Sequence, residues 1–389
     1  MTARLAMVAG EASGDLLGGL LLSGLNRRLP GVQTYGIGGE RMTAQGFRAD
    51  WPIEKLAVRG YVEVLKHYPE IALIRARLRR RLLENPPSAF IGIDAPDFNL
   101  GLEIALRRKK IPVIHFVSPS IWAWRGGRIG KIGEAVDHML LLFPFEKELY
   151  DKAGIAATYV GHPLADIIPL QPDRGKAREH LGLPAGAEVL ALMPGSRMSE
   201  IKYIAPLFVE TAKRLKSVAP QLQIVVPMVG AQTCKYFDQI ARNESAGGEL
   251  FKIVEGQSHA VLAACDAVLV ASGTATLEAA LFKRPMVIAY RVAYWSALLM
   301  RGMGYLPWVG LPNILARDFL VPEFLQDAAT PQALCDAALF QLRDAPNREK
   351  LHARFTEIHL ALRCNTAEKA AEVVAAVLEN KIVQRSASQ

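Results

Sequence analysis

Short apolar runs rich in Val, Ile and Leu alternate along the chain with longer amphipathic stretches. The runs are almost continuously apolar, which is typical of strands in a parallel sheet with helices on both faces. The stretches between them, such as residues 15–29 and 204–218, carry apolar residues every three or four positions, as helices do. The sequence therefore predicts an α/β fold. The expected strands are LAMVAG, AFIGID, IPVIHFV and HMLLLF in the first half, and EVLALMPG, LQIVVPMV, AVLVASG and PMVIAY in the second.

The alternation of strands and helices stops and restarts near residue 166. Residues 161–177 contain three prolines and a charge cluster and lack periodicity, as expected of a linker. A chain of 389 residues is also too long for one ordinary domain. We therefore expect two doubly wound, Rossmann-like domains, residues 1–166 and 167–345, that face each other across a cleft. Residues 346–389 show only helical patterns and predict a tail that crosses back to the first domain.

The composition is that of a folded protein with a basic surface. Hydrophobic residues make up 51% of the chain and charged residues 22%, and the formal net charge is +8. Such a charge attracts nucleic acid, acidic lipid headgroups or phosphorylated small molecules, and by itself it does not choose among them. Basic residues interleaved with aromatic ones occur only between Trp122 and Lys131, so nucleic acid is not the expected partner.

The cysteines and the N-terminus exclude several classes of protein. The four cysteines are scattered, with no Cys-x-x-Cys and no His-x-x-x-His pair, so we expect neither a metal site nor disulfides, and a reducing cytoplasm fits best. Glu11 and Asp15 interrupt the apolar N-terminal region, which argues against a secretion signal. No apolar run is long enough to span a bilayer.

In open parallel sheets, ligands bind beyond the carboxyl ends of the strands, so turns that follow strands are the candidate sites. In AVLVASGTATLEAAL the strand is expected to end at Ala271, and Ser272, Gly273 and Thr274 open a helix whose free amides and hydroxyls suit phosphate. Glu278 lies one turn further on, where a carboxylate suits two ribose hydroxyls. The alternative is an ordinary helix cap at Ser272 or Thr274, with Glu278 as a partner of the helix dipole.

A second turn of this kind follows the strand EVLALM. Here Pro194 and Gly195 lead into Ser196 and Arg197 at the start of a helix. A guanidinium at this place can hold a diphosphate through two parallel hydrogen bonds and neutralise a departing nucleotide. The alternative is a surface ion pair between Arg197 and Glu200. Two anion-seeking turns in one domain favour a diphosphate ligand.

Two turns of the first domain suit an acceptor. In AFIGIDAPDFN, Asp94 is expected directly at a strand end, where a carboxylate can act as general base for an attacking hydroxyl, whereas Asp97 is expected to be a helix N-cap. In VAGEASGD, Glu11 would repel phosphate, so Glu11 and Ser13 are expected to contact sugar hydroxyls. A tight turn with Ser13 as helix cap is the alternative. Neither a P-loop nor a dinucleotide fingerprint is present.

Two further stretches have mixed character. In SPSIWAWRGGRIGK, Trp122 and Trp124 cannot share one face, so one is expected in the core and the other against a sugar or an acyl chain. Residues 60–83 place apolar side chains beside a run of arginines, which fits a surface that lies on acidic lipid. An ordinary packed helix with a solvated basic face explains these residues equally well.

Taken in order, the motifs of this chain resemble those of the lipid-A-disaccharide synthases. The resemblance implies the two-domain GT-B fold and an inverting transfer of diacylglucosamine from its UDP derivative to 2,3-diacylglucosamine 1-phosphate, which releases UDP. It also implies that Asp94 is the catalytic base and that Arg197, Glu278 and Asn313 lie on the nucleotide side. We expect neither a metal nor a cofactor, because protein cations and helix dipoles can supply the positive charge. The matching pieces are GEASGD, GIDAPDFN, SPSIWAWR, FPFEK, GHPLAD, PGSR, ASGTATLEA, PMVIAYR, LPNIL and RCN.

The acylated substrates of such an enzyme live in membranes. We therefore expect reversible binding to the anionic cytoplasmic face of the inner membrane of a Gram-negative bacterium, and a homodimer is left open. Two other functions also stay open. One is another enzyme that acts on UDP-sugars, such as an epimerase. The other is a protein without catalytic activity that binds acidic lipid or nucleic acid.

Overall fold

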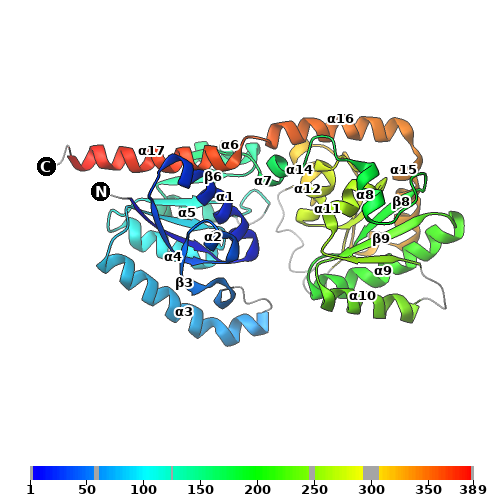
Figure 1. Ribbon diagram of the computed structural model, residues 1–389, viewed down its shortest axis with the longest axis horizontal. Helices are drawn as coiled ribbons and strands as arrows, with labels where there is room; N and C mark the ends of the chain where they lie inside the picture. Colours follow the sequence, from blue (N-terminus) through cyan, green and yellow to red (C-terminus); the bar gives the residue numbers. More distant parts are fainter. Residues whose placement is uncertain (1–2, 57–60, 124–125, 245–249, 292–305, 387–389) are drawn as a thin grey trace. The chain divides into compact units, whose positions relative to one another are not determined.

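The computed structural model describes residues 3–56, 61–123, 126–244, 250–291 and 306–386 (Figure 1). The chain forms two compact units. Unit 1 comprises Met1–Asp166 and Leu362–Gln389, and unit 2 comprises Ile167–Ala361. Each unit is built around one parallel sheet with helices on both faces, so the predicted α/β class and the doubly wound sheets are confirmed.

The sheet of unit 1 has seven parallel strands in the order β3-β2-β1-β4-β5-β6-β7. The strands are β1 Arg4–Ala9, β2 Gln33–Gly38, β3 Arg48–Pro52, β4 Ala89–Ile93, β5 Val113–Phe116, β6 His138–Leu141 and β7 Ala157–Tyr159. The helices are α1 Ala12–Arg28, α2 Glu40–Thr43, α3 Tyr61–Glu84, α4 Pro96–Arg107, α5 Arg128–Ala135, α6 Lys147–Lys152, α7 Pro163–Ile167 and α17 Thr366–Ser386, with short 3₁₀ helices at Ile53–Lys55 and Pro144–Glu146. The strand order reverses between β1 and β4, so the turns that follow these two strands lie side by side.

The last helix belongs to unit 1. Helix α17 packs on α1 so closely that a Cβ on Gly24 would lie 2.2 Å from the carbonyl oxygen of Ala367. At its start, the Asp166 carboxylate accepts hydrogen bonds from the amides of Asn365 (2.9 Å) and Thr366 (2.7 Å). The helical tail expected from residue 346 thus consists of α16 (Ala345–Leu362), most of which is counted with unit 2, and α17.

The sheet of unit 2 has six parallel strands in the order β10-β9-β8-β11-β12-β13. The strands are β8 Val189–Met193, β9 Gln223–Met228, β10 Lys252–Glu255, β11 Ala267–Ala271, β12 Met286–Tyr290 and β13 Glu323–Leu325. The helices are α8 Arg174–His180, α9 Met198–Val218, α10 Ala231–Glu244, α11 Ser258–Ala264, α12 Thr274–Leu281, α14 Leu311–Ala316, α15 Pro331–Arg343 and α16, with a 3₁₀ helix at Gln326–Ala328. Here the order reverses between β8 and β11.

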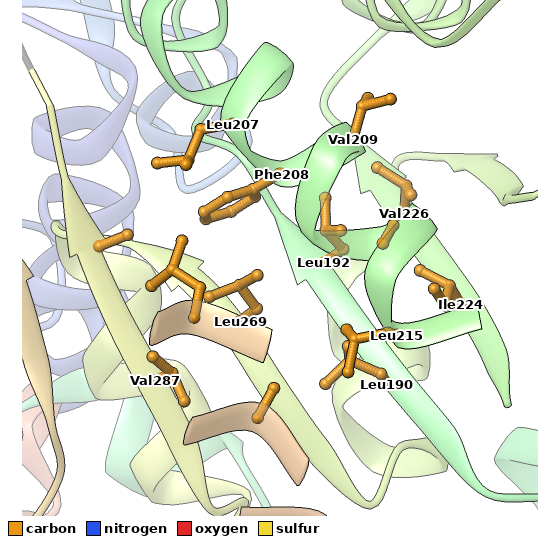
Figure 2. Packing of buried hydrophobic residues seen from close by; sticks show 14 of the residues in the cluster. Leu190, Leu192, Leu207, Phe208, Val209, Leu215, Ile224, Val226, Leu269 and Val287 are labelled. Carbon is orange, nitrogen blue, oxygen red and sulfur yellow. The ribbon is translucent and has the colours of Figure 1, made fainter. Parts of the chain in front are cut away.

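One face of this sheet carries a large apolar core (Figure 2). Leu192 of β8 and Leu269 of β11 are fully buried and pack with Phe208 of α9. The central strands β8 and β11 are buried along their whole length, which is why they are continuously apolar in sequence. No helix in the described ranges is both long enough and apolar enough to cross a membrane.

Candidate active site

The backbone of unit 1 is unusual where β4 ends. Asp94 and Ala95 both have positive φ, 52° and 44°, a backbone conformation that residues other than glycine rarely adopt. The Asp94 amide donates to the carbonyl of Phe116 (2.9 Å), and its carbonyl accepts from Nδ2 of Asn99 (2.8 Å). On the neighbouring strand end Val117, a β-branched residue, has φ 85°. Strain of this kind persists only where surrounding contacts hold it, and it is concentrated at functional sites.

The turn that follows β1 touches this strained turn. A Cβ on Gly10 would lie only 2.4 Å from the Cβ of Ala95, so the close approach requires glycine. Glu11 is the N-cap of α1 and makes no side-chain capping bond, and Ser13 is exposed in the first turn. Ser13 is therefore not a helix cap, and Glu11 and Ser13 lie at the same switch point as Asp94.

Asp15, in the same motif, has a structural role that its sequence did not reveal. Its carboxylate is buried and accepts hydrogen bonds from the backbone amides of Gly39 (2.8 Å), Arg41 (2.9 Å) and Met42 (3.1 Å). It therefore fixes the start of α2 beside α1. The three amides lie more than twenty residues away, so local sequence gave no signal for this contact.

The interpretation of Asp97 as a helix N-cap is wrong. Helix α4 begins at Pro96 with Ala95 as its N-cap and has no side-chain capping bond. The exposed Asp97 carboxylate instead accepts from Nη2 of Arg128 at 2.9 Å. Proline at the first helical position fixes the start of the helix two residues earlier than expected.

Trp122 is the packed tryptophan of its motif. Its indole N–H donates to Oε1 of Glu146 at 3.1 Å, and its ring lies edge-on to Phe145 with the centroids 5.2 Å apart. The expectation of a sugar contact is thus not supported for Trp122, because its polar atom is already used and its ring is in an aromatic cluster. Trp124, the other candidate, lies outside the described residues.

Glu146, in the motif FPFEK, was missed as a key residue. It is almost completely buried, and burial raises the pKa of its carboxyl to about 8, against the opposing effect of hydrogen bonds from the Phe143 amide and from Trp122. Its two oxygens accept from Trp122 and, at 3.0 Å, from the Phe143 amide. This one side chain therefore ties the SPSIW loop to the FPFEK turn.

In unit 2 the turn after β8 already binds a carboxylate. Gly195 has φ 114°, and Oε2 of Glu200 accepts hydrogen bonds from the amides of Ser196 (3.1 Å) and Arg197 (3.3 Å). The Arg197 guanidinium donates to Oε1 of Glu200 at 3.1 Å, so the ion pair considered as the alternative is present. The Arg197 side chain is nevertheless 56% exposed. The turn is therefore suited to an anion, and its cation is accessible.

The adjacent turn after β11 opens α12. Gly273 is the N-cap, with φ 153°, and no side chain caps the helix. Ser272 instead donates to the carbonyl of Val309 at 3.5 Å, and Thr274 is exposed. The alternative of an ordinary Ser or Thr cap is thus excluded. The amides and the hydroxyl of this first turn face solvent-accessible space, where an anion can bind.

Glu278 lies one turn into α12 and is mostly buried. Burial raises the pKa of its carboxyl to about 7. In the described part of the chain, Nε2 of His259 lies 3.9 Å from Oε2 of Glu278, too far for a hydrogen bond, and burial lowers the pKa of that histidine. A buried carboxyl with so little compensation is suited to accept hydrogen bonds from a ligand.

Asn313 does not fit the expectation of a direct ligand contact. Its side chain is fully buried, and Nδ2 donates to the Val321 carbonyl (2.9 Å) and to Oε1 of Glu323 (2.8 Å). Its Oδ1 accepts from the amides of Leu320 (2.9 Å) and Val321 (3.0 Å). All its hydrogen-bonding positions are therefore used. Asn313 holds Glu323, which in turn accepts from the amides of Val309 and Gly310 beside the carbonyl that contacts Ser272, so any effect on a ligand is indirect.

The structure therefore gathers the predicted residues into two groups, one in each unit. Glu11, Ser13 and Asp94 lie at the β1/β4 switch point. The second group lies at the β8/β11 switch point and comprises Ser196, Arg197, Ser272, Gly273, Thr274 and Glu278. Within the described ranges, no three His, Cys, Asp or Glu side chains come together in a way that could hold a metal ion.

The family model described as lipid-A-disaccharide synthetase matches residues 5–377. The chain belongs to this family. It is 58% identical over 379 residues to a lipid-A-disaccharide synthase of Burkholderia pseudomallei (strain 1710b), and 57% identical to one of Paraburkholderia xenovorans, with 97% of each chain covered in both cases. The predicted family is confirmed, and with it the class of enzyme: a hexosyltransferase of lipid A biosynthesis.

Solved structures share the fold at low sequence identity. A UDP-GlcNAc 2-epimerase from Neisseria meningitidis bound to UDP-GlcNAc has a TM-score of 0.63 at 11% identity, with 98% of this chain and 100% of that chain covered. The glycotransferase of kitacinnamycin has a TM-score of 0.62 at 17% identity, with 97% and 99% covered. S. aureus MnaA, in a co-structure with UDP, has a TM-score of 0.60 at 11% identity, with 96% and 95% covered. These likenesses support the two-sheet fold.

Proposed function

We propose that the enzyme joins UDP-2,3-diacylglucosamine to 2,3-diacylglucosamine 1-phosphate in a single displacement with inversion. The primary hydroxyl oxygen of the acceptor attacks the anomeric carbon of the donor, and its proton passes to Asp94. The bond between the anomeric carbon and the phosphate oxygen breaks, and its electron pair leaves with UDP. The products are the β-1,6-linked disaccharide 1-phosphate and UDP.

In this proposal, Asp94 is the base that takes the proton from the acceptor hydroxyl. The strained backbone holds its carboxyl group at the end of a central strand, with Glu11 and Ser13 on the adjoining turn. A base must lie within hydrogen-bond reach of the hydroxyl that it deprotonates, and a held strand end supplies that fixed position. Glu11 and Ser13 are proposed to contact the hydroxyls of the acceptor sugar.

The donor is proposed to bind at the β8/β11 switch point of unit 2. The first-turn amides of α12 at Gly273 and Thr274, together with Arg197, would hold the diphosphate and stabilise the charge that develops on departing UDP. Glu278 would accept the ribose hydroxyls. Glu200 would have to release Arg197 and the amide of Ser196 when the diphosphate arrives. The epimerase and the MnaA protein of the same fold, whose structures contain UDP-GlcNAc and UDP, support a uridine nucleotide as ligand.

Association with a membrane is proposed from the second half of α3. Leu73 is 49% exposed there, and it lies with Arg77 and Arg80 along a groove of about 960 Å³ that also borders on Lys109. Basic side chains beside an exposed apolar one suit anionic headgroups above an acyl layer. We propose that this surface brings the enzyme to the cytoplasmic face of the inner membrane, where its acylated substrates reside.

A two-substrate assay with the product identified by mass spectrometry tests the reaction. With both acylated sugars supplied, the expected product has the mass of the disaccharide 1-phosphate, and UDP appears in equal amount. An epimerase would instead convert UDP-N-acetylglucosamine alone into its epimer. That result, without disaccharide from the two acylated sugars, would overturn the proposal.

A further inference from the structure

A buried acid–histidine pair lies beneath the end of β4. Glu103 of α4 and His115 of β5 are both completely buried, and Nδ1 of His115 lies 2.6 Å from Oε1 of Glu103. The pair fills the space above Gly92, where an added Cβ would lie 2.0 Å from the Glu103 carboxylate and 3.0 Å from His115 Nδ1. Glycine is therefore required at this point, two residues before Asp94.

The charge of Glu103 favours the protonated form of His115. Burial acts to lower the pKa of His115, but the charge and the hydrogen bond of Glu103, helped by the charge of Asp94, outweigh it and raise the pKa above its ordinary value. The charged groups that face His115 are thus Glu103 on α4 and Asp94 at the end of β4. A buried ion pair adds little stability compared with apolar packing, so stability does not explain why one lies here.

Polar atoms around the pair connect it to Asp94. Six buried side-chain atoms have no hydrogen-bond partner in the described part of the chain, and three of them lie in or beside this pair: His115 Nε2, Glu103 Oε2 and Asn99 Oδ1. Asn99 and Glu103 are four residues apart on one face of α4, and Asn99 donates to the Asp94 carbonyl at 2.8 Å. Most buried polar atoms in proteins are paired, so three unpaired ones in one cluster indicate a functional region.

We propose that Glu103 and His115 act as a positioning pair for Asp94, in which the imidazolium favours the carboxylate form that accepts the proton. This inference rests on the proposed role of Asp94 as the base. His115 touches no substrate. Glu103 keeps His115 charged and oriented, and Asn99 fixes the backbone of Asp94. The pair acts as a unit, because either partner alone would be an uncompensated charge in the interior and would become neutral.

The electrostatic coupling between Asp94 and His115 can be measured without an activity assay. In the whole enzyme, the His115 ring is followed by NMR against pH, with the resonance assigned by its loss in His115→Gln. Because electrostatic coupling is reciprocal, Asp94→Asn should move the His115 titration midpoint down by about half a pH unit or more. Asp97→Asn removes an exposed carboxyl from the same turn and should leave the midpoint in place. An equal midpoint in wild type and Asp94→Asn would overturn the pairing.

Kinetics give the second measurement. Glu103→Gln, His115→Gln and the double variant should each lower kcat about tenfold or more. Each should also move the acidic limb of the kcat/KM profile to higher pH, and the shift should be equal in all three variants because the pair acts as a unit. UDP affinity, measured by calorimetry, should not change. If the pair has only a structural role, the variants should lose thermal stability but keep the acidic limb at the same pH. That result would refute the inference.

The two proposals fail in different ways. An Asp94→Asn enzyme of normal activity would overturn the role of Asp94 as base, and the function of the pair with it. An inactive Asp94→Asn enzyme with an unshifted His115 midpoint would overturn the pair alone.

Discussion

Glu278→Gln gives the sharpest test of the donor site, because the charge state of Glu278 changes near neutral pH. Burial raises the pKa of this carboxyl to about 7. The carboxylate accepts hydrogen bonds at both oxygens, whereas the protonated acid uses one oxygen as a donor. If the carboxylate binds the ribose, affinity follows its ionised fraction, which rises from about one tenth at pH 6 to about nine tenths at pH 8. Donor affinity in the wild type should therefore rise about tenfold across this interval.

The glutamine variant should lack this pH dependence. At pH 8 it should also bind about tenfold more weakly than the wild type, since a hydrogen bond to a charged group contributes about 1.5–3 kcal/mol. The assay is calorimetry with UDP-N-acetylglucosamine at pH 6, 7 and 8. This probe is preferable to UDP, because a terminal phosphate titrates at about pH 6, within the interval over which Glu278 changes its charge, and a sugar diphosphate diester does not.

Glu179→Gln on α8 is the matched control, since it removes the same charge from an exposed position outside the turns that are proposed to bind the nucleotide. Its affinity and pH dependence should match those of the wild type. His259 lies beside Glu278, but burial lowers the pKa of His259, so it stays neutral over most of the interval. A flat wild-type profile, or an equal slope in Glu278→Gln, would show that Glu278 does not bind the nucleotide.

Four further predictions address the other parts of the molecule. Asp94→Asn should lower turnover by about 10²–10⁴ with UDP affinity unchanged, and near-normal turnover would remove it as the base. Arg197→Ala should weaken UDP binding about tenfold or more by calorimetry, while Arg214→Ala on the exposed side of α9 should not; equal affinities would refute the assignment. Because burial raises the pKa of Glu146 to about 8, the folded state keeps a proton that the unfolded state releases. Wild-type stability should therefore fall relative to Glu146→Gln as the pH rises from about 5 to about 8, by on the order of 4 kcal/mol, and parallel denaturation curves would contradict this. The enzyme should sediment with anionic vesicles at low salt and be released by high salt, and failure to bind would exclude the basic surface of α3 as a membrane contact.

Much of the fold could be predicted because its central strands are uniformly apolar. β1, β4, β8 and β11 are buried on both faces, and each contains the continuous apolar run that indicated it. Five strands were not predicted: β2, β3, β7, β10 and β13. The edge strands β3, β7, β10 and β13 are short and partly exposed, and β2 is buried but carries polar and glycine residues among its apolar ones. Hydrogen bonds to a neighbouring strand stabilise these strands, and the local sequence does not show which segment that neighbour is.

The candidate site shows the same division. Ser272, Thr274 and Arg197 could be chosen because a rule about strand ends applies to the local sequence. Asn313 could not be judged in that way, since the atoms that use its amide come from a loop several residues further on and from β13. Glu146 and Asp15 were missed for the related reason that their roles lie in amides and rings brought close only by folding.

Strand order is what turns these separate motifs into sites. The sequence placed PGSR and ASGT after two different strands, and only the pairing of β8 with β11 makes them neighbours. The Glu200 carboxylate in the PGSR turn then does more than cap a helix, because it occupies a site for an anion. It shows that the amides of Ser196 and Arg197 bind an anion in this geometry, and the nucleotide diphosphate proposed to bind here would compete with it for Arg197. The Arg197 side chain is about half exposed and that of Glu200 about one third exposed, so both can change partners by rotation about side-chain bonds.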